Sequence, residues 1–206
     1  MEFFNTNILF YLAAYLFGSI PFGSILAKTF AGVDITASGS KSIGATNVLR
    51  VVKETNPVLA KKLGIATVIL DALKGTLVLI VAMYVGVSDA TLWAIAVLAV
   101  LGHCYSAYLK FEGGKGVATG LGVYLVLIPI PTLIGAIVWI VCAKVLKISS
   151  LSSLLGLVAV VVSASFLNNG LNVGSNAPMY IIAFIIIYKH IPNIIRIIKG
   201  EEKKVI

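Results

Sequence analysis

The sequence predicts an all-α protein: a polytopic transmembrane helical bundle of about seven spans, in a single domain over residues 1–206. Of the 206 residues, 59% are hydrophobic and 12% are charged, and the mean hydropathy is +1.04. Soluble domains are about 45–50% apolar and about 25% charged. Because one span takes about 20 mostly apolar residues, the chain has room for about six or seven crossings and little else.

Apolar runs between Gly, Pro and charge clusters place the spans. The runs lie near residues 8–30, 63–86, 91–109, 115–129, 131–147, 151–167 and 177–191, and a short amphipathic helix is expected near 44–53. The first run lacks a basic region ahead of it and is longer than the apolar core of a signal peptide, so we interpret it as a span. The fourth and fifth are the weakest, since only residues 129–131 (PIP) separate them, and one of them could be a re-entrant hairpin.

Basic residues occur in alternate connections. The first, third and fifth connections and the C-terminal tail carry Lys or Arg, whereas the second, fourth and sixth carry neither. The positive-inside rule therefore predicts an N-terminus outside and a cytoplasmic C-terminus, which requires an odd number of spans and favours seven. The net charge is +8. Because the cations lie on one membrane face, anionic lipid and anionic substrates explain them better than nucleic acid does.

The first connection contains the residue types of an anion-binding loop. Residues 39–47 read GSKSIGATN, and Arg50 follows. Glycines let the backbone turn its N–H groups toward an anion, and Ser40, Thr46 and Asn47 add neutral polar groups. Arg50 would supply a planar, permanent charge for a phosphate. A solvated turn followed by an amphipathic helix explains the segment equally well.

A second glycine-rich segment lies in the third connection, where residues 112–116 read EGGKG. Gly113, Gly114 and Gly116 around Lys115 would form a phosphate cradle at a helix start. The spacing is not that of a Walker A loop, so no nucleotide binding is expected. Taken alone, the string suits a flexible linker at least as well.

Two charges, Asp71 and Lys74, stand about one helical turn apart inside the second apolar run. Ionisable residues within spans are costly and usually face a pathway or a site. A mutually neutralised i,i+3 pair is the alternative. His103 has no second ligand at metal spacing and His190 is distant in sequence, so no metal site is expected.

His190 lies at the end of the last apolar run, with Asn193 and Arg196 on adjoining turns. Their i, i+3 and i+6 spacing places three polar groups on roughly one helix face. Such a face suits a substrate site, and ordinary anchoring at the membrane interface is the alternative.

In their order and content, the motifs resemble one family. They are GSIPFG (18–23), GSKSIGATNVLR (39–50), DALKG (71–75), GH (102–103), EGGKGVATGLG (112–122) and KHIPNIIRIIKGEE (189–202). Over essentially its whole length, the chain is similar to the bacterial acyl-phosphate–glycerol-3-phosphate acyltransferases, a family of small polytopic inner-membrane enzymes.

The resemblance implies a reaction. A fatty acyl group moves from acyl phosphate to the 1-hydroxyl of glycerol 3-phosphate, which gives lysophosphatidic acid and phosphate at the first step of phospholipid synthesis. The implied partners are these substrates and membrane lipid, at the cytoplasmic side of the inner membrane, and no cofactor is indicated. A transporter of phosphorylated metabolites is the alternative. No internal repeat supports it, and the polar clusters lie on one side only.

The resemblance also assigns residues. The first motif supplies Ser40 and Arg50, the second the glycines that bind glycerol phosphate, and the third His190, Asn193 and a structural Glu202. We therefore expect catalytic Ser40, Arg50, His190 and Asn193; substrate-binding Asn47, Thr46, Lys74, His103, Gly113, Gly114, Lys115 and Gly116; and structural Asp71 and Glu202.

The chain departs from the family pattern at several positions. Thr36 stands where the family usually has arginine, and Lys41-Ser42 stand where it usually has Gly-Asn. Ser106 and Glu112 replace a usual proline and lysine. These departures leave the phosphate contacts around residues 36–42 open.

Overall fold

The computed structural model describes residues 6–167 and 172–204, and the regular secondary structure there is entirely helical, as predicted. The helices are α1 (Thr6–Ser19), α2 (Phe22–Ala31), α3 (Ala45–Val52), α4 (Pro57–Val85), α5 (Asp89–Cys104), the 3-10 turn η1 (Ala107–Leu109), α6 (Val117–Leu127), α7 (Pro129–Leu146), α8 (Ser149–Leu167), α9 (Ala177–Lys189) and α10 (Ile191–Ile198). The amphipathic helix expected near 44–53 is α3.

Five segments of the described chain are long and apolar enough to cross a membrane: Thr6–Ala31, α4, Asp89–Leu109 (α5 with η1), α7 and α8. Helices α9 and α10 are bent by 56° relative to each other, and the number of candidate spans becomes six if this pair counts as one span. Helix α6 has 11 residues, a length of about 16 Å at 1.5 Å per residue, and a hydrocarbon core is about 30 Å thick. The protein is therefore a multi-pass membrane protein, and a seventh crossing stays a prediction because it depends on this short helix.

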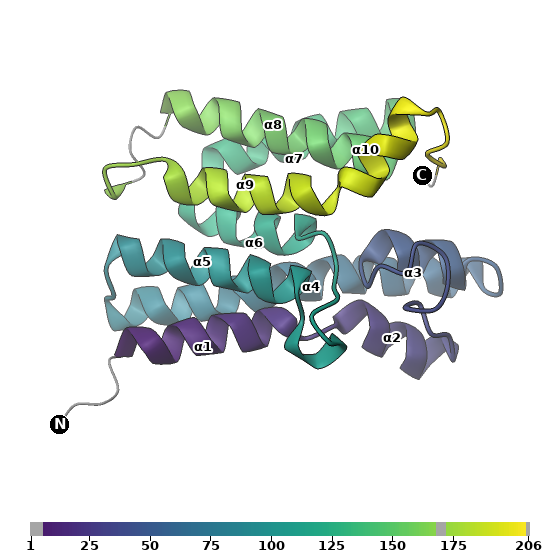
Figure 1. The fold of residues 1–206 in the computed structure, drawn as a ribbon, viewed down its shortest axis with the longest axis horizontal. Helices are drawn as coiled ribbons and strands as arrows, with labels where there is room; N and C mark the ends of the chain where they lie inside the picture. The colour runs from purple at the N-terminus through teal and green to yellow at the C-terminus, as the bar shows by residue number, and fades with distance from the viewer. Residues whose placement is uncertain (1–5, 168–171, 205–206) are drawn as a thin grey trace.

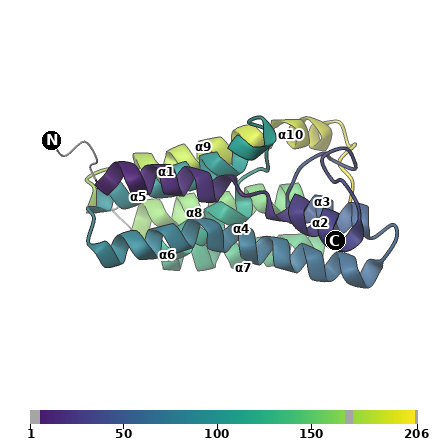
Figure 2. The same ribbon diagram turned by 90° about the horizontal axis from the view of Figure 1, so that it is seen from below.

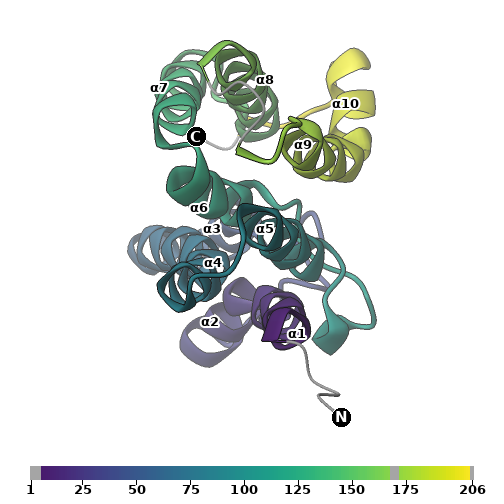
Figure 3. The same ribbon diagram turned by 90° about the vertical axis from the view of Figure 1, so that its left-hand side faces the viewer.

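The long helices form two groups with α6 between them. Helices α1, α4 and α5 lie on one side and α7, α8 and α9 on the other (Figure 3). The main hydrophobic core runs through both groups, from Ala14 and Ile95 through Val123 to Val160 and Ile182. Many large apolar side chains on the outside are exposed, which fits a bundle that contacts lipid rather than water.

The helices α2, α3 and α10 gather at one end of the bundle, which we call the polar end (Figures 1 and 2). Helix α1 begins at the opposite end, so the described chain starts and finishes at different ends of the bundle. A chain that starts and finishes at different ends of the bundle is consistent with an odd number of membrane crossings. Which end faces the cytoplasm stays a prediction.

The first span is broken, although the sequence predicted one continuous run over residues 8–30. Helix α1 ends at Ser19 and α2 begins at Phe22. Pro21 explains the break, because proline lacks an amide hydrogen and disfavours helical backbone in the preceding residue. The freed carbonyl of Ile20 accepts a hydrogen bond of 2.9 Å from the Lys74 ammonium.

Lys74 also pairs with the Asp71 carboxylate at 2.9 Å, and both side chains are almost fully buried. Ser106, which stands where the family usually has proline, donates from its hydroxyl to the Ser19 carbonyl at 2.6 Å. The carbonyls at the end of α1 thus find donors on α4 and on the 105–116 connection. The predicted Asp71/Lys74 pair is real, and it supports the break in the first span.

We expect Lys74→Met to lower the stability of the folded protein by about 3–5 kcal/mol, because it leaves the Asp71 carboxylate buried without its counter-charge. The measurement is the thermal unfolding midpoint in detergent. Adding Asp71→Asn should recover part of the loss, and the exposed Lys62→Met serves as the control. Equal midpoints for Lys74→Met and Lys62→Met would contradict this account of the pair.

Candidate active site

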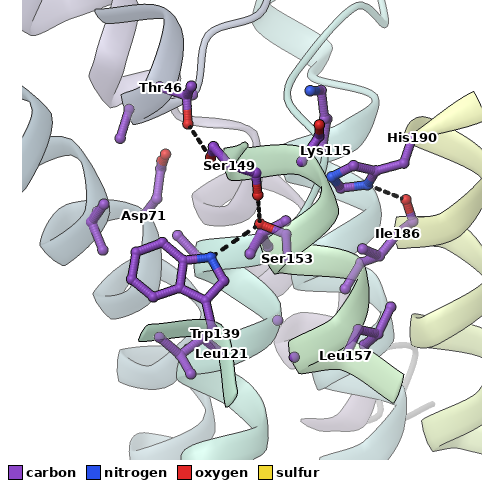
Figure 4. A pocket seen from close by; sticks show the side chains of 18 of the residues that line it. Thr46, Asp71, Lys115, Leu121, Trp139, Ser149, Ser153, Leu157, Ile186 and His190 are labelled. Carbon is purple, nitrogen blue, oxygen red and sulfur yellow. Dashed lines mark hydrogen bonds between the residues drawn. The ribbon is translucent and has the colours of Figure 1, made fainter. Parts of the chain in front are cut away.

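A cavity of about 360 Å³ begins at the polar end and continues inward between α6, α7 and α8 (Figure 4). Its polar lining consists mostly of residues that the sequence predicted. The predicted site residues that line it are Ser40, Thr46, Asn47, Arg50, Asp71, His103, Lys115, His190, Asn193 and Glu202. These residues come from five separate parts of the chain, so the fold brings the three predicted motifs together in one place.

Four predicted residues lie outside the lining: Lys74, Gly113, Gly114 and Gly116. Lys74 binds Ile20 and Asp71 at the break of the first span. These contacts give Lys74 a supporting position behind Asp71, and its predicted role in substrate binding stays a prediction. The physical reason is that a proline break inside the bundle leaves a buried carbonyl that needs a donor.

Asn47 organises the loop before α3. Its amide nitrogen donates to the carbonyls of Ile35, Ser38 and Ser42 at 2.9–3.1 Å. Its amide oxygen accepts the Ser40 N–H at 2.8 Å. The side chain is 1% exposed, and all its polar atoms are occupied within the loop. Asn47 therefore positions Ser40, and its predicted role in holding substrate stays a prediction.

The departures from the family pattern in this loop have local explanations. Lys41 has φ 58°, a left-handed conformation that suits the glycine usual at this position. Thr36 donates from its hydroxyl to the Asp34 carboxylate at 2.6 Å, and neither Thr36 nor Lys41 lines the cavity. The side of the loop that faces the cavity is thus formed by Ser40 and Ser42.

The glycines of the 112–116 segment are explained by close packing. A Cβ on Gly113 would meet the backbone carbonyl of His103, and one on Gly114 would overlap the His103 ring. The Gly114 N–H donates to the His103 carbonyl at 3.0 Å, and Gly116 has φ 83°. The glycines therefore let the backbone lie against α5, and the side chain that lines the cavity from this segment is Lys115.

Burial lowers the pKa of Lys115 to about 8, and the neighbouring Glu202 carboxylate only partly opposes this effect. The charges of Arg196 and Arg50 contribute to the same lowering of the pKa. Lys115 is thus mostly protonated at neutral pH and close to losing its charge just above it. An anion bound beside it would favour the charged form.

Glu202 joins three parts of the chain at the polar end. One carboxylate oxygen accepts hydrogen bonds from Ser150 at 2.7 Å and from Asn193 at 2.6 Å, and the other accepts from Arg196 at 2.6 Å. Burial raises the pKa of Glu202, but these three hydrogen bonds outweigh it and hold the pKa below its usual value. The geometry agrees with a structural part for Glu202.

His190 lies at the bend between α9 and α10 and is 1% exposed. Its Nδ1 is 2.7 Å from the Ile186 carbonyl oxygen. Because a carbonyl only accepts, Nδ1 carries the hydrogen, and Nε2 of the neutral ring presents a lone pair. Figure 4 shows His190 and Lys115 among the side chains of the cavity.

His103 and Asp71 are neighbouring polar residues in the lining of the cavity. The His103 Nδ1 is 3.7 Å from an Asp71 carboxylate oxygen, which is too long for a hydrogen bond. Both side chains are buried. In the described part of the chain, no group of three or more His, Cys, Asp or Glu residues could hold a metal ion.

Sequence reasoning missed the serines at the start of α8. Ser149 shares a hydrogen bond of 3.0 Å with Thr46, Ser150 bonds Glu202, and Ser153 accepts from the indole N–H of Trp139 at 3.2 Å. All three line the cavity. The available signal was the run of four serines in ISSLSS (148–153) at the start of an apolar segment.

Comparison with known proteins agrees with this geometry. The sequence profile described as glycerol-3-phosphate acyltransferase matches residues 8–200. The chain belongs to the glycerol-3-phosphate acyltransferase family. Family relatives of that name include one from Aliarcobacter butzleri, 80% identical and covering 98% of each chain. Another, from Sulfurimonas denitrificans, is 62% identical with the same coverage. The resemblance inferred from the motifs is thus confirmed.

A solved structure shares the family fold. The crystal structure of PlsY (YgiH), an integral membrane glycerol 3-phosphate acyltransferase, in its glycerol 3-phosphate form matches with a TM-score of 0.85 at 33% identity. The match covers 97% of this chain and 96% of that one. The lysophosphatidic acid form of PlsY matches with a TM-score of 0.84.

We expect Asn47→Ala to loosen the loop before α3, because three backbone carbonyls and one N–H lose their partner. The cost should be about 1–3 kcal/mol. Hydrogen exchange of residues 35–44 in detergent is the measurement. Asn56→Ala is the matched control, since Asn56 caps α4 by accepting from Leu59 N–H. Equal exchange in both variants would show that Asn47 does not hold the loop.

Proposed function

We propose that this protein transfers a fatty acyl group from acyl phosphate to the 1-hydroxyl of glycerol 3-phosphate, giving lysophosphatidic acid and phosphate. The observation that carries the proposal is one continuous cavity with two kinds of lining. Its outer part contains cations and hydrogen-bonding side chains, and its inner part is apolar and lies between membrane helices. Such a cavity suits one small anion and one activated lipid, and membership of the acyltransferase family supports the same reaction.

Two cations are suited to the two phosphates. Arg50 offers a planar fork of donors and Lys115 a compact ammonium, and both line the outer part of the cavity. Ser40 and Ser42 add hydroxyl groups from the loop that Asn47 holds. We propose that glycerol 3-phosphate binds here, and that the acyl chain extends into the apolar part.

The chemistry needs positioning more than a covalent intermediate. Acyl phosphate is already activated, and in the described chain no serine hydroxyl is hydrogen-bonded to a histidine ring. That leaves no paired nucleophile and base for an acyl-enzyme. The hydroxyl oxygen of glycerol 3-phosphate then attacks the acyl carbon directly, and the bond from that carbon to the phosphate oxygen breaks. The departing phosphate takes the electron pair and can accept the hydroxyl proton.

His190 and Asn193 are placed to guide this step. The Nε2 lone pair of His190 would accept the hydrogen bond of the attacking hydroxyl and orient it. Asn193 gives one amide hydrogen to Glu202 and has a second to polarise the acyl carbonyl. His103, whose side chain also lines the cavity, is the second candidate for a protein base.

The cytoplasmic side of the bacterial inner membrane is the proposed location of the site. The basic connections predicted to be cytoplasmic supply residues to this cavity, Arg50 from the first and Lys115 from the third. The transporter alternative is disfavoured, because the inner part of the cavity is apolar and ends at buried side chains.

The deciding experiment offers radiolabelled glycerol 3-phosphate to the purified protein in detergent, with palmitoyl phosphate, palmitoyl-CoA or palmitoyl carrier protein as donor. We expect lysophosphatidic acid from palmitoyl phosphate alone. His190→Ala should reduce turnover by roughly 10²-fold or more. Tyr188→Phe, a change at an exposed residue of α9 two positions away, should not reduce it.

Each other result has a distinct meaning. If lysophosphatidic acid forms from palmitoyl-CoA instead, the assignment of acyl phosphate as donor is wrong, and the assignment of glycerol 3-phosphate as acceptor still holds. Absence of product from every donor, with correctly folded protein, would refute the proposed function.

A second prediction concerns pH. Because the pKa of Lys115 is about 8, the ammonium is lost as the pH rises through this value, and a neutral amine no longer pairs with phosphate. The phosphate of glycerol 3-phosphate, with a second pKa near 6, keeps its charge throughout. The KM for glycerol 3-phosphate should therefore rise above pH 8 in the natural protein.

Lys115→Arg is the matched control, since a guanidinium stays charged over the whole range. Its KM should be flat between pH 7 and pH 9, whatever its absolute value. Parallel pH profiles for the two proteins would remove Lys115 from the phosphate site.

A further inference from the structure

The apolar part of the cavity has a closed inner end. Helices α6 and α8 run away from the polar end and α7 runs back toward it, so Tyr124, Val160 and Thr132 are the deepest lining residues on the three helices. All three are buried, with exposures of 2%, 6% and 1%. The ten residue steps along α8 from Ser150 to Val160 correspond to a depth of about 15 Å.

The floor is rigidly held. The Tyr124 hydroxyl donates to the Met179 carbonyl of α9 at 2.8 Å, and its ring packs against Trp93 of α5 with centroids 6.4 Å apart. A rotation of this side chain would leave a buried hydroxyl and a buried ring without partners. Tyr124 therefore stays in place when the cavity fills.

The walls beside the floor are tightly packed too. Gly135 of α7 faces α8, and a Cβ there would overlap the Val160 side chain and meet the Gly156 carbonyl. Helices α7 and α8 thus touch through their backbones at this depth and leave little room to separate. A chain that reaches the floor meets resistance on three sides.

The same cavity also opens sideways. Val68 of α4, Leu121 of α6, and Trp139 and Ile140 of α7 line the cavity and are each 37–46% exposed on the outer face of the bundle. This opening lies above the floor and gives an acyl donor access from the lipid. The tail of a bound donor has two routes: inward to the floor, or back out into the bilayer.

We propose that the acyl tail occupies the closed inner end and that Tyr124, with Val160 and Thr132, sets the longest acyl chain that the enzyme accepts. This inference rests on the proposed acyl transfer. Packing favours the inner route. If the cavity stays empty, the side chains of its walls lose their dispersion contacts, whereas lipid molecules in the bilayer can move into the space that the tail has left. A chain too long for the cavity must distort its walls, and overpacking of this kind costs enough to reduce kcat/KM roughly tenfold or more.

The test measures kcat/KM for saturated acyl phosphates that increase in steps of two carbons. Val160→Ala and Tyr124→Leu deepen the cavity and should move the cut-off to longer chains. Val160→Leu makes it shallower and should move the cut-off to shorter ones. Comparing chain lengths within one preparation cancels any general loss of folded protein, so a purely structural effect of a substitution would not move the cut-off.

Two controls separate the floor from its surroundings. Val162→Ala makes the same change as Val160→Ala on the lipid-facing side of α8, where Val162 is 50% exposed, and should leave the profile unaltered. Tyr124→Phe keeps the ring and removes the hydroxyl, so the cut-off should stay while the floor loses its hydrogen bond to Met179.

If the cut-off is the same in all active variants, the tail leaves through the side opening and the inference is wrong, although the proposed reaction stands. If the natural protein transfers no acyl chain of any length, the proposed function itself fails.

Discussion

Backbone groups that are freed inside a membrane must find partners within the protein, because lipid offers none. This constraint governs the polar half of the structure. At the break between α1 and α2, the Ile20 carbonyl takes its donor from Lys74 and the Ser19 carbonyl takes one from Ser106. Lys74 in turn requires Asp71 as its counter-charge, and Asp71 forms part of the cavity wall beside His103.

The same constraint connects the break to the glycine segment. Because α5 ends beside the broken span, the 105–116 connection folds back over both. Gly113 and Gly114 allow its backbone to lie against the end of α5, where a Cβ would collide with His103. Lys115 is then the residue that reaches the cavity. Lys115 is thus positioned by close packing of the glycine backbone against α5.

Two side chains hold the rest of the polar end together. Asn47 occupies all of its hydrogen-bonding capacity within one loop, and Glu202 gathers Ser150, Asn193 and Arg196 around one carboxylate. Buried polar networks are stabilising only when every member is satisfied. Asn47 meets this condition, and the Glu202 carboxylate accepts three hydrogen bonds, so Ser40 and Asn193 are held in a defined orientation.

The sequence by itself determined the membrane character and the family. Composition and apolar runs are sufficient to establish the membrane character, because a span that lies in lipid must consist mostly of apolar residues. The motifs are sufficient for the family, and ten of the site residues that they predict line a single cavity. Only the tertiary structure decided which side of each motif faces inward. Lys74 contacts Ile20, Gly113 and Gly114 pack against α5, and the serines of α8 line the cavity. The sequence did not indicate these contacts, because each one joins segments that are distant in sequence. The closed floor at Tyr124 depends on the same kind of contact, since neither the length of α6 nor its composition indicates that α5 and α9 hold that ring in place.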